Sequence, residues 1–262
     1  IGVSSTFNEG TSFWFEIPLE KTTETLKPKQ DVPELEATTD KIQGKRVLVA
    51  EDNLTNQLIT RSFLERLGLR VDVANNGLEA SEMALERPYD LILMDIAMPE
   101  MDGITATKQI REANSENLKL PIVAFTAYTT LEDIDEILAN GMDGYITKPF
   151  TKDQLYSTIA KHLTGQDETT DKLNASNNTS PEKVIDVEIL HELLSDQDTK
   201  TRKQLIDQFS KDVTRYMNET EQGVATGDWS SVQHASHGLK GSAGMFGASR
   251  LCEVAETVND LC

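Results

Sequence analysis

The chain has 262 residues, of which 44 are acidic and 25 basic, so its formal net charge at pH 7 is −19. Such an acidic surface repels phosphate backbones and anionic lipid headgroups, which argues against broad electrostatic binding to nucleic acid or membranes. Hydrophobic residues make up 38%, enough for packed cores, and no apolar run reaches the ~20 residues that span a bilayer. The composition therefore indicates a soluble chain of one large or two ordinary domains.

The ends of the chain indicate a piece of a longer cytoplasmic protein. Cys252 and Cys262 fall in one predicted helix, where ten residues rise about 15 Å, beyond the ~7 Å that a disulfide bridges between Cα atoms. A pair that cannot form a disulfide is typical of a reducing compartment. The chain begins at Ile1 rather than Met and carries no signal segment, so we expect residues upstream.

Two stretches without hydrophobic periodicity divide the chain into three parts. Residues 20–44 and 164–183 are rich in polar and charged side chains, and they cannot bury enough apolar surface to offset the entropy of ordering. We therefore expect two flexible linkers. Residues 1–19, with the aromatic-rich segment Gly10–Pro18, are too short to fold alone and are predicted to be an orphan strand of a larger domain.

The middle part, residues 45–163, alternates short apolar runs with amphipathic stretches five times. The runs are Val47–Ala50, Leu69–Ala74, Leu91–Met94, Pro121–Thr126 and Gly144–Thr147. The amphipathic stretches are Asn53–Leu67, Gly77–Arg87, Gly103–Ala113, Thr129–Asn140 and Thr151–Leu163. Continuous apolar runs are typical of strands covered on both faces. We therefore predict an α/β doubly wound, five-stranded parallel sheet with helices on each side.

The last part, residues 184–262, contains no strand pattern. A long helix is indicated by apolar side chains at helical spacing, namely Leu205, Ile206, Phe209, Val213, Tyr216 and Met217. A shorter helix precedes it at Val187–Leu194, and two more begin near Asp228 and Phe246. This pattern predicts an all-α helical bundle.

Polar side chains gather at one edge of the predicted sheet. Glu51 and Asp52 follow the first strand, Asp95 the third, Thr126 ends the fourth and Lys148 follows the fifth. Ligands of open parallel sheets bind at this edge. Each residue alone has an ordinary explanation, such as a helix cap, a strand residue or a surface charge, but their joint position favours a functional site.

Three carboxylates at one edge repel each other and need cations. Lys148 supplies one positive charge, and Mg²⁺, which prefers carboxylate, carbonyl and water oxygens, suits the remainder. A carboxylate beside Mg²⁺ and a lysine can act as a nucleophile on phosphorus. Asp95 is the central candidate, Thr126 is placed to donate its hydroxyl to a phosphoryl oxygen, and Tyr145 is a candidate reporter of occupancy.

Four segments carry a resemblance to a known family: Val47–Asn53, Leu93–Gly103, Phe125–Ala127 and Lys148–Phe150. Together they resemble the response-regulator receiver domain over residues 45–163. The resemblance implies the flavodoxin-like strand order 2-1-3-4-5 and a cis peptide bond between Lys148 and Pro149. It also implies roles for individual residues: Asp95 as phosphoacceptor, Asp52, Asp95 and the Ala97 carbonyl as Mg²⁺ ligands, Lys148 as phosphoryl clamp, and Thr126 with Tyr145 as switch pair. Glu51 replaces a more frequent Asp, so its longer arm favours a metal contact through water.

A histidine motif lies in the predicted bundle. By spacing alone, His237 is equally well explained as an exposed histidine and as a docking site. The string His237-Gly238-Leu239-Lys240-Gly241-Ser242 resembles the histidine phosphotransfer domain, which implies His237 as phosphoacceptor and Lys240 as the partner of a phosphoryl group on nitrogen. Gly241 would leave the imidazole accessible. We expect the bundle to be incomplete at its carboxyl end, because that family has one more helix.

The other three histidines fit the acceptor role less well. His234 lies one helical turn before His237 but lacks the following Leu-Lys-Gly, while His162 and His191 are expected to be surface residues.

The whole chain resembles the carboxyl-terminal portion of a hybrid sensor histidine kinase. Gly2-Val3, Gly10–Phe15 and Ile17–Leu19 resemble the closing strands of the kinase ATPase domain, whose ATP-binding and autophosphorylating core would lie upstream. The resemblance implies a phosphorelay from a kinase histidine of the same protein to Asp95, then to His237, and then to a separate response regulator. It admits a parent protein that is dimeric and anchored in the inner membrane, with this part on the cytoplasmic side.

Two other functions are weighed against the phosphorelay. A phosphohydrolase of the haloacid-dehalogenase type also uses an aspartate nucleophile, but it needs an acid two residues later, where this chain has Ala97. A non-catalytic receiver-like interaction module would not need the set Asp52, Asp95, Thr126 and Lys148.

Overall fold

The computed structural model describes residues 2–6, 10–14, 41–113, 119–126, 131–165, 184–195 and 197–261, without the side chains of residues 2–6, 10–14 and 131–133. The chain splits into two compact units, Ile1–Leu35 and Glu36–Cys262. In the first, β1 (Gly2–Thr6) pairs antiparallel with β2 (Gly10–Trp14), with Gly2 opposite Trp14. The rest of the strand predicted at Gly10–Pro18 lies outside the described residues.

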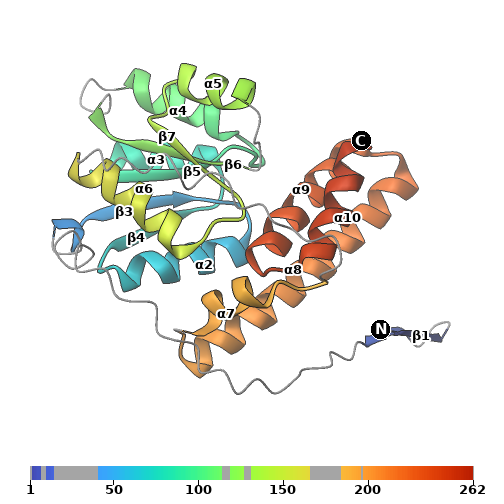
Figure 1. Ribbon diagram of the computed structural model, residues 1–262. Helices are drawn as coiled ribbons and strands as arrows, with labels where there is room; N and C mark the ends of the chain where they lie inside the picture. The colour runs from blue at the N-terminus through green and yellow to red at the C-terminus, as the bar shows by residue number, and fades with distance from the viewer. Residues whose placement is uncertain are drawn as a thin grey trace. The chain divides into compact units, whose positions relative to one another are not determined.

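The second unit contains a five-stranded parallel sheet (Figure 1). Its strands are β3 (Arg46–Ala50), β4 (Arg70–Ala74), β5 (Leu91–Asp95), β6 (Ile122–Thr126) and β7 (Gly144–Thr147). They are ordered β4-β3-β5-β6-β7, and every neighbouring pair is parallel. The predicted fold class and the strand order 2-1-3-4-5 are therefore confirmed.

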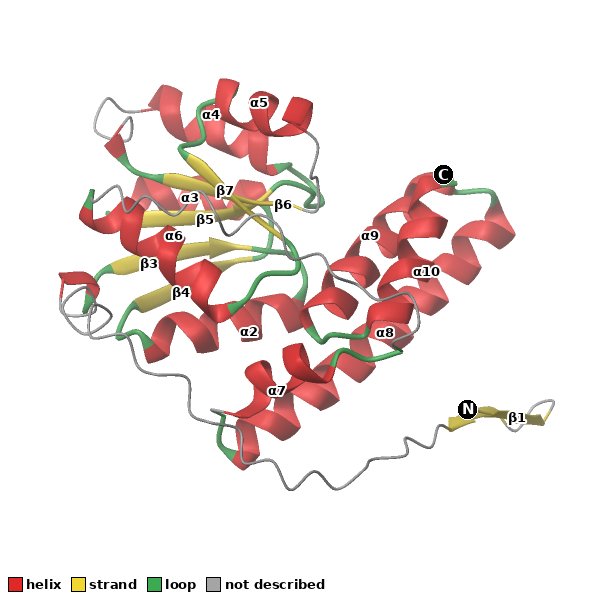
Figure 2. Cartoon of the chain, in the orientation of Figure 1, coloured by secondary structure: helices red, strands yellow, loops and turns green. Residues whose placement is uncertain are grey.

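Helices cover both faces of the sheet (Figure 2). One face carries α2 (Leu54–Arg66) and α6 (Lys152–Thr164), and the other carries α3 (Gly77–Glu86), α4 (Gly103–Ala113) and α5 (Leu131–Ala139). The strand β3 shows why both faces are apolar. Val47 and Val49 pack into the core with α2 and α6, whereas Leu48 and Ala50 pack into the core with α3 and α4. Side chains alternate between the two faces, so a continuous apolar run serves two cores.

Local capping explains where the helices begin and end. Asn53, predicted to be the first helical residue, is the N-cap of α2, and its side chain accepts a hydrogen bond from the Asn56 N–H at 3.1 Å. Thr151 and Gln154 form a capping box at the start of α6. At the other end of α2, Gly68 has φ of +80°, a left-handed conformation in which glycine carries no Cβ penalty. The chain can therefore turn directly from α2 into β4.

The last part of the unit is helical, as predicted. It consists of α7 (Val187–Ser195), α8 (Thr199–Thr226), α9 (Trp229–Met245) and α10 (Ser249–Asp260). Asp198 and Asp228 cap α8 and α9. Tyr216, Ala235, Leu239 and Ala255 form a small core within these helices. The predicted start near Asp228 is confirmed for α9, whereas α10 begins at Ser249, three residues after the predicted Phe246, which is the C-cap of α9.

Further expectations have mixed outcomes. The peptide bond between Lys148 and Pro149 is cis, as the family resemblance implied. Ile42 lies in the range expected to be a linker, but its side chain is completely buried in the α2 and α6 core. Among the described helices, none has the length and apolar character needed to cross a membrane. The remaining parts of the two expected linkers, residues 20–40 and 166–183, lie outside the described residues.

His162 was expected to be a surface residue, but it is half-buried. It packs over Gly144, whose missing side chain leaves room for the ring. Burial holds the pKa of His162 below its usual range, and the nearby Asp143 offsets this only in part. The exposed His191 has the surface position that was expected for both residues.

The burial of His162 predicts an acid-sensitive contribution to stability. Because its pKa is lowered in the folded state, the stabilisation is present above the unfolded pKa of about 6.5 and is lost as the pH falls below it. We expect His162→Gln to reduce the fall in urea midpoint between pH 7 and pH 5, measured by circular dichroism. His191→Gln is the matched control, and an equal effect of both changes would contradict the prediction.

Candidate functional site

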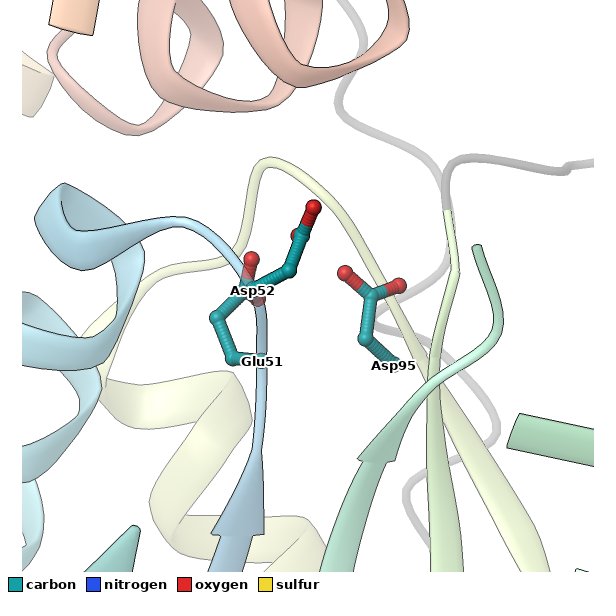
Figure 3. Close-up of side chains that lie close together, drawn as sticks. All are labelled: Glu51, Asp52 and Asp95. Carbon is teal, nitrogen blue, oxygen red and sulfur yellow. The ribbon is translucent and has the colours of Figure 1, made fainter. Parts of the chain in front are cut away.

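Three carboxylates meet at the carboxyl edge of the sheet (Figure 3). Glu51 and Asp52 directly follow β3, and Asp95 is the last residue of β5. Each offers an oxygen atom, and these atoms lie within 4.8 Å of one another. The sequence predicted this cluster, because neighbouring parallel strands end at the same edge.

Lys148 joins two of the carboxylates. Its Nζ atom lies 2.6 Å from Glu51 Oε2 and 2.6 Å from Asp95 Oδ2. The side chains of all three residues are at most 5% exposed. Asp52, at 12%, is the carboxylate most open to solvent. The site therefore holds three acidic groups and one basic group, mostly away from water.

The pKa values reflect this imbalance. Burial, together with Asp95 and Asp52, raises the pKa of Glu51 to about 8, although Lys148 opposes the shift. Burial and the charge of Asp95 also raise the pKa of Asp52. For Lys148, burial alone would lower the pKa, but Asp95 and Glu51 raise it above its usual range. Lys148 therefore remains protonated. Its single positive charge does not balance the three acidic groups, so a further positive charge would stabilise their ionised forms.

Neighbouring polar groups fix Glu51. Its Oε1 atom accepts hydrogen bonds from the Asn56 side chain at 3.1 Å and from the Asn53 backbone at 3.3 Å. Gln57 donates to the Glu51 backbone carbonyl at 2.5 Å. Sequence reasoning missed these amide side chains because they lie within the predicted helix, where amides are ordinary surface residues.

The remaining predicted residues of the receiver-like part lie on β6, on β7 and in the loop after β5. Thr126 ends β6 and is 1% exposed, while Tyr145 in β7 is half-buried against the core formed with α3 and α4. Ala97 follows β5 in the loop toward α4 and is partly exposed. At the start of α4, Gly103 passes so close to the Asp95 carbonyl oxygen that a Cβ atom would collide with it. The glycine therefore allows the loop to fold back beside Asp95.

The structure brings α9, which carries His234 and His237, to this edge. His237 in α9 is partly buried, and burial lowers its pKa, while the charge of Asp95 acts in the opposite direction and that of Lys148 in the same direction. His234 Nε2 lies 3.6 Å from Asp52 Oδ2. Lys240 Nζ forms an ion pair with Glu256 of α10 at 2.7 Å. His237 thus shares the electrostatic environment of Asp95, and its imidazole is favoured in the neutral form near pH 7.

Apolar contacts connect the bundle to the face of the sheet that carries α2 and α6. One buried cluster contains Leu193, Leu205, Met245 and Phe246 of the bundle together with side chains of α2 and α6. The Phe209 and Phe246 rings stack with centroids 4.2 Å apart. Gly244 of α9 leaves space for Pro149, since a Cβ atom would lie 3.3 Å from that ring.

The acidic cluster has the donor set of a divalent-cation site. Carboxylate oxygens, offered here by three residues within 4.8 Å of one another, are hard ligands that such cations prefer. The raised pKa values of Glu51 and Asp52 are those of carboxylates that lack enough positive charge nearby. These residues therefore fit a divalent cation.

Comparisons with known proteins agree with this geometry. The family model of the response regulator receiver domain matches residues 47–160, and that of the Hpt domain matches residues 204–262. The chain is 31% identical over 212 residues, 81% of its length, to the aerobic respiration control sensor protein ArcB of Escherichia coli O157:H7. It is 38% identical over 151 residues, 46% of its length, to probable histidine kinase 1 of Oryza sativa subsp. indica.

Among solved structures, the receiver domain of sensor histidine kinase PA1611 from Pseudomonas aeruginosa is 36% identical, with 47% of this chain and 99% of that chain covered and a TM-score of 0.43. The chain spans 27% of the length of ArcB and 16% of the rice kinase. The chain therefore joins a response regulator receiver domain to an Hpt domain and is homologous to the carboxyl-terminal region of hybrid histidine kinases.

Proposed function

We propose that this chain carries two successive steps of a phosphorelay, in which Asp95 accepts a phosphoryl group and exchanges it with His237. The observation that carries the proposal is that α9, the helix of His237, lies against the acidic cluster of the receiver domain: His234 Nε2 is 3.6 Å from Asp52 Oδ2, and Ser242 accepts a hydrogen bond from Asn53. The presence of receiver and Hpt domains in one chain agrees with this role.

In the first step, a carboxylate oxygen of Asp95 attacks phosphorus, and the bond from phosphorus to the donor breaks. Lys148 is held beside Asp95 and neutralises charge on the phosphoryl oxygens. Thr126 donates its hydroxyl to one of these oxygens, and Tyr145 responds to its position. When bound, Mg²⁺ would be held by Asp52, Asp95 and the Ala97 carbonyl, with Glu51 acting through water, and would supply the remaining positive charge.

In the second step, a neutral ring nitrogen of His237 attacks phosphorus and the Asp95 carboxylate leaves. The lowered pKa of His237 keeps the attacking nitrogen unprotonated at neutral pH. Proximity supplies much of such a rate enhancement, so the bundle needs no general base of its own. Lys240, now paired with Glu256, would exchange that partner for the phosphoryl group on nitrogen.

The same proposal sets the place of the chain in a larger protein. Residues 1–19 would close a kinase ATPase domain, residues 20–44 and 164–183 would be linkers, residues 45–163 the receiver domain, and residues 184–262 the phosphotransfer domain. The donor would be a kinase histidine of the same hybrid kinase, and the final acceptor a separate response regulator. We place these steps in the cytoplasm, with any membrane anchor and dimer contact in other parts of that protein.

Acetyl phosphate and Mg²⁺ test the proposal. Intact-mass measurement should show label on the wild-type chain, first in an acid-stable and base-labile acyl phosphate and then in an acid-labile histidine phosphate. Asp95→Asn should remove both, and His237→Gln should retain only the first. His234→Gln is the matched control, with label on both residues expected. Label that persists in Asp95→Asn would overturn the assignment.

Mg²⁺ should also stabilise the folded receiver domain. At a concentration 100 times its dissociation constant, a ligand of the folded state raises the free energy of unfolding by about 2.7 kcal/mol. We expect that gain in urea unfolding of the wild-type chain, and little of it in Asp52→Asn. The exposed residue Asp102 lies in the neighbouring loop, so Asp102→Asn should retain the gain. Equal losses in both variants would argue against a site at Asp52.

A receiver-like interaction module without phosphoryl chemistry is the second candidate. It predicts that a phosphate mimic with Mg²⁺ leaves the amide spectra of Thr126 and Tyr145 unchanged. A haloacid-dehalogenase phosphohydrolase has little support, because Ala97 supplies no general acid.

A further inference from the structure

The contact between the receiver domain and the bundle has a buried polar end. The apolar cluster around Phe246 covers one part of the contact. At the other part, the first turn of α2 meets polar side chains of α8 and α9. Apolar surface can pack against many partners. A buried polar group needs a partner that forms its hydrogen bond, because leaving it unpaired costs free energy. The polar end can therefore distinguish one receiver domain from another.

Asp212 of α8 is the central polar residue. It is 2% exposed, and its Oδ2 atom accepts hydrogen bonds from Thr55 Oγ1 at 2.5 Å and from the Thr55 N–H at 3.2 Å. Its Oδ1 atom accepts a hydrogen bond from Gln208 at 3.1 Å, and Arg215 lies 3.7 Å away. A carboxylate is favoured at the amino-terminal end of a helix, where backbone N–H groups lack partners. Asp212 thus binds the start of α2 from the opposite domain.

Asn53 makes the second polar contact. Its Nδ2 atom donates to Tyr216 Oη at 2.8 Å and to Ser242 Oγ at 2.7 Å. Its side-chain oxygen caps α2 through Asn56. The amide nitrogen of Asn53 thus donates twice and its side-chain oxygen accepts once. Tyr216 and Ser242 are at most 1% exposed. A side chain without two donors at position 53 would leave buried hydroxyl groups unpaired.

We propose that Asp212, Tyr216 and Ser242 are specificity-determining residues, which select receiver domains with an amide after the acidic pair and a hydroxyl two positions later. This inference rests on the proposed function, since it concerns which receiver exchanges phosphoryl groups with His237. The preferred partner is the receiver domain of this chain, or one with the same first turn. A receiver with a carboxylate in place of Thr55 is rejected, because it would face Asp212 at hydrogen-bond distance in a dry contact.

Charge at position 55 tests the inference in the full chain. Thr55→Asp suits the helix start itself but opposes Asp212. We expect the ratio of docked to undocked chains to fall about a hundredfold, measured by hydrogen exchange of α9 peptides with mass spectrometry. The rate of phosphoryl transfer from Asp95 to His237, compared at equal label on Asp95, should fall at least about tenfold.

Two further variants make the test specific. Leu54→Asp adds the same charge at the neighbouring residue, which is 49% exposed, and should leave exchange and transfer unchanged. The double variant Thr55→Asp with Asp212→Asn should restore both, because the amide can donate to the new carboxylate. Equal effects of the two single changes, or no restoration by the double variant, would overturn the inference.

The two readouts separate the proposals. If exchange in α9 follows the expected pattern but no label reaches His237 in the wild-type chain, the recognition stands and the proposed relay fails. If label reaches His237 and exchange does not respond to Thr55→Asp, the relay stands and Asp212 does not determine specificity.

Discussion

Replacing Lys148 with alanine is expected to lower the free energy of unfolding by about 3–5 kcal/mol, the usual effect of removing one partner of a buried ion pair. The change leaves Glu51 and Asp95 close together with no basic side chain between them. Without Lys148, which opposes the raised pKa of Glu51, that pKa should rise further, so stability is lost as the pH rises and the deficit is larger at pH 8 than at pH 5. Urea unfolding followed by circular dichroism at both values measures it.

The ion pair between Lys45 and Asp90 supplies the control. It has the same chemistry, but its side chains are 40% and 35% exposed, and exposed pairs contribute at most about 1 kcal/mol. Lys45→Ala should therefore have a small effect that changes little between pH 5 and pH 8. If both alanine variants lowered the free energy of unfolding equally, burial of the Lys148 ion pairs would not increase their contribution to stability.

Gly238→Ala is the second change with a large expected effect. Alanine is the better helix former by about 1 kcal/mol, but a Cβ atom at position 238 would overlap the ring and hydroxyl of Tyr216, which is 1% exposed. Overpacking of this kind costs about 1–3 kcal/mol. We expect a net destabilisation in urea unfolding and slower transfer to His237, because Tyr216 and the neighbouring imidazole must both move.

Gly241 in the same helix is the matched comparison. Among the described residues, a Cβ atom there would meet Asn56 Nδ2 alone within 4 Å, at 3.4 Å, which is an ordinary contact. Gly241→Ala should therefore stabilise the helix by up to about 1 kcal/mol. Both substitutions replace glycine with alanine in the same helix. If the free energy of unfolding falls for Gly238→Ala and rises for Gly241→Ala, the loss is due to the contact with Tyr216. Destabilisation by both would instead indicate a general demand for glycine in α9.

The site on the receiver domain was predictable because its residues follow from local patterns. Continuous apolar runs gave the strands, and the residues after them, such as Asp52 and Asp95, lie together once the strands are parallel. The cis peptide bond at Pro149 came from the family resemblance rather than from the pattern.

The contact between domains was not predictable in the same way. Asn53 and Tyr216 are 163 positions apart, and no periodicity connects residues at that separation. In the sequence, Asp212 is an ordinary polar residue of a helix, and Ser242 belongs to the histidine motif. Both are buried because α2 packs against them. The burial of His162 was not predictable either, because it depends on the missing side chain of Gly144 in a neighbouring strand.

The burial of Tyr216, Ser242 and Asp212 against α2 affects how fast the proposed relay can pass phosphoryl groups on. A phosphotransfer face that is covered by its own receiver domain serves one receiver at a time. In the proposed relay, delivery to a second receiver domain would wait for the internal contact to open, so the dissociation rate of that contact would limit the rate of delivery. The timing of that delivery would then depend on a few buried hydrogen bonds that begin at Asn53, directly after the acidic pair.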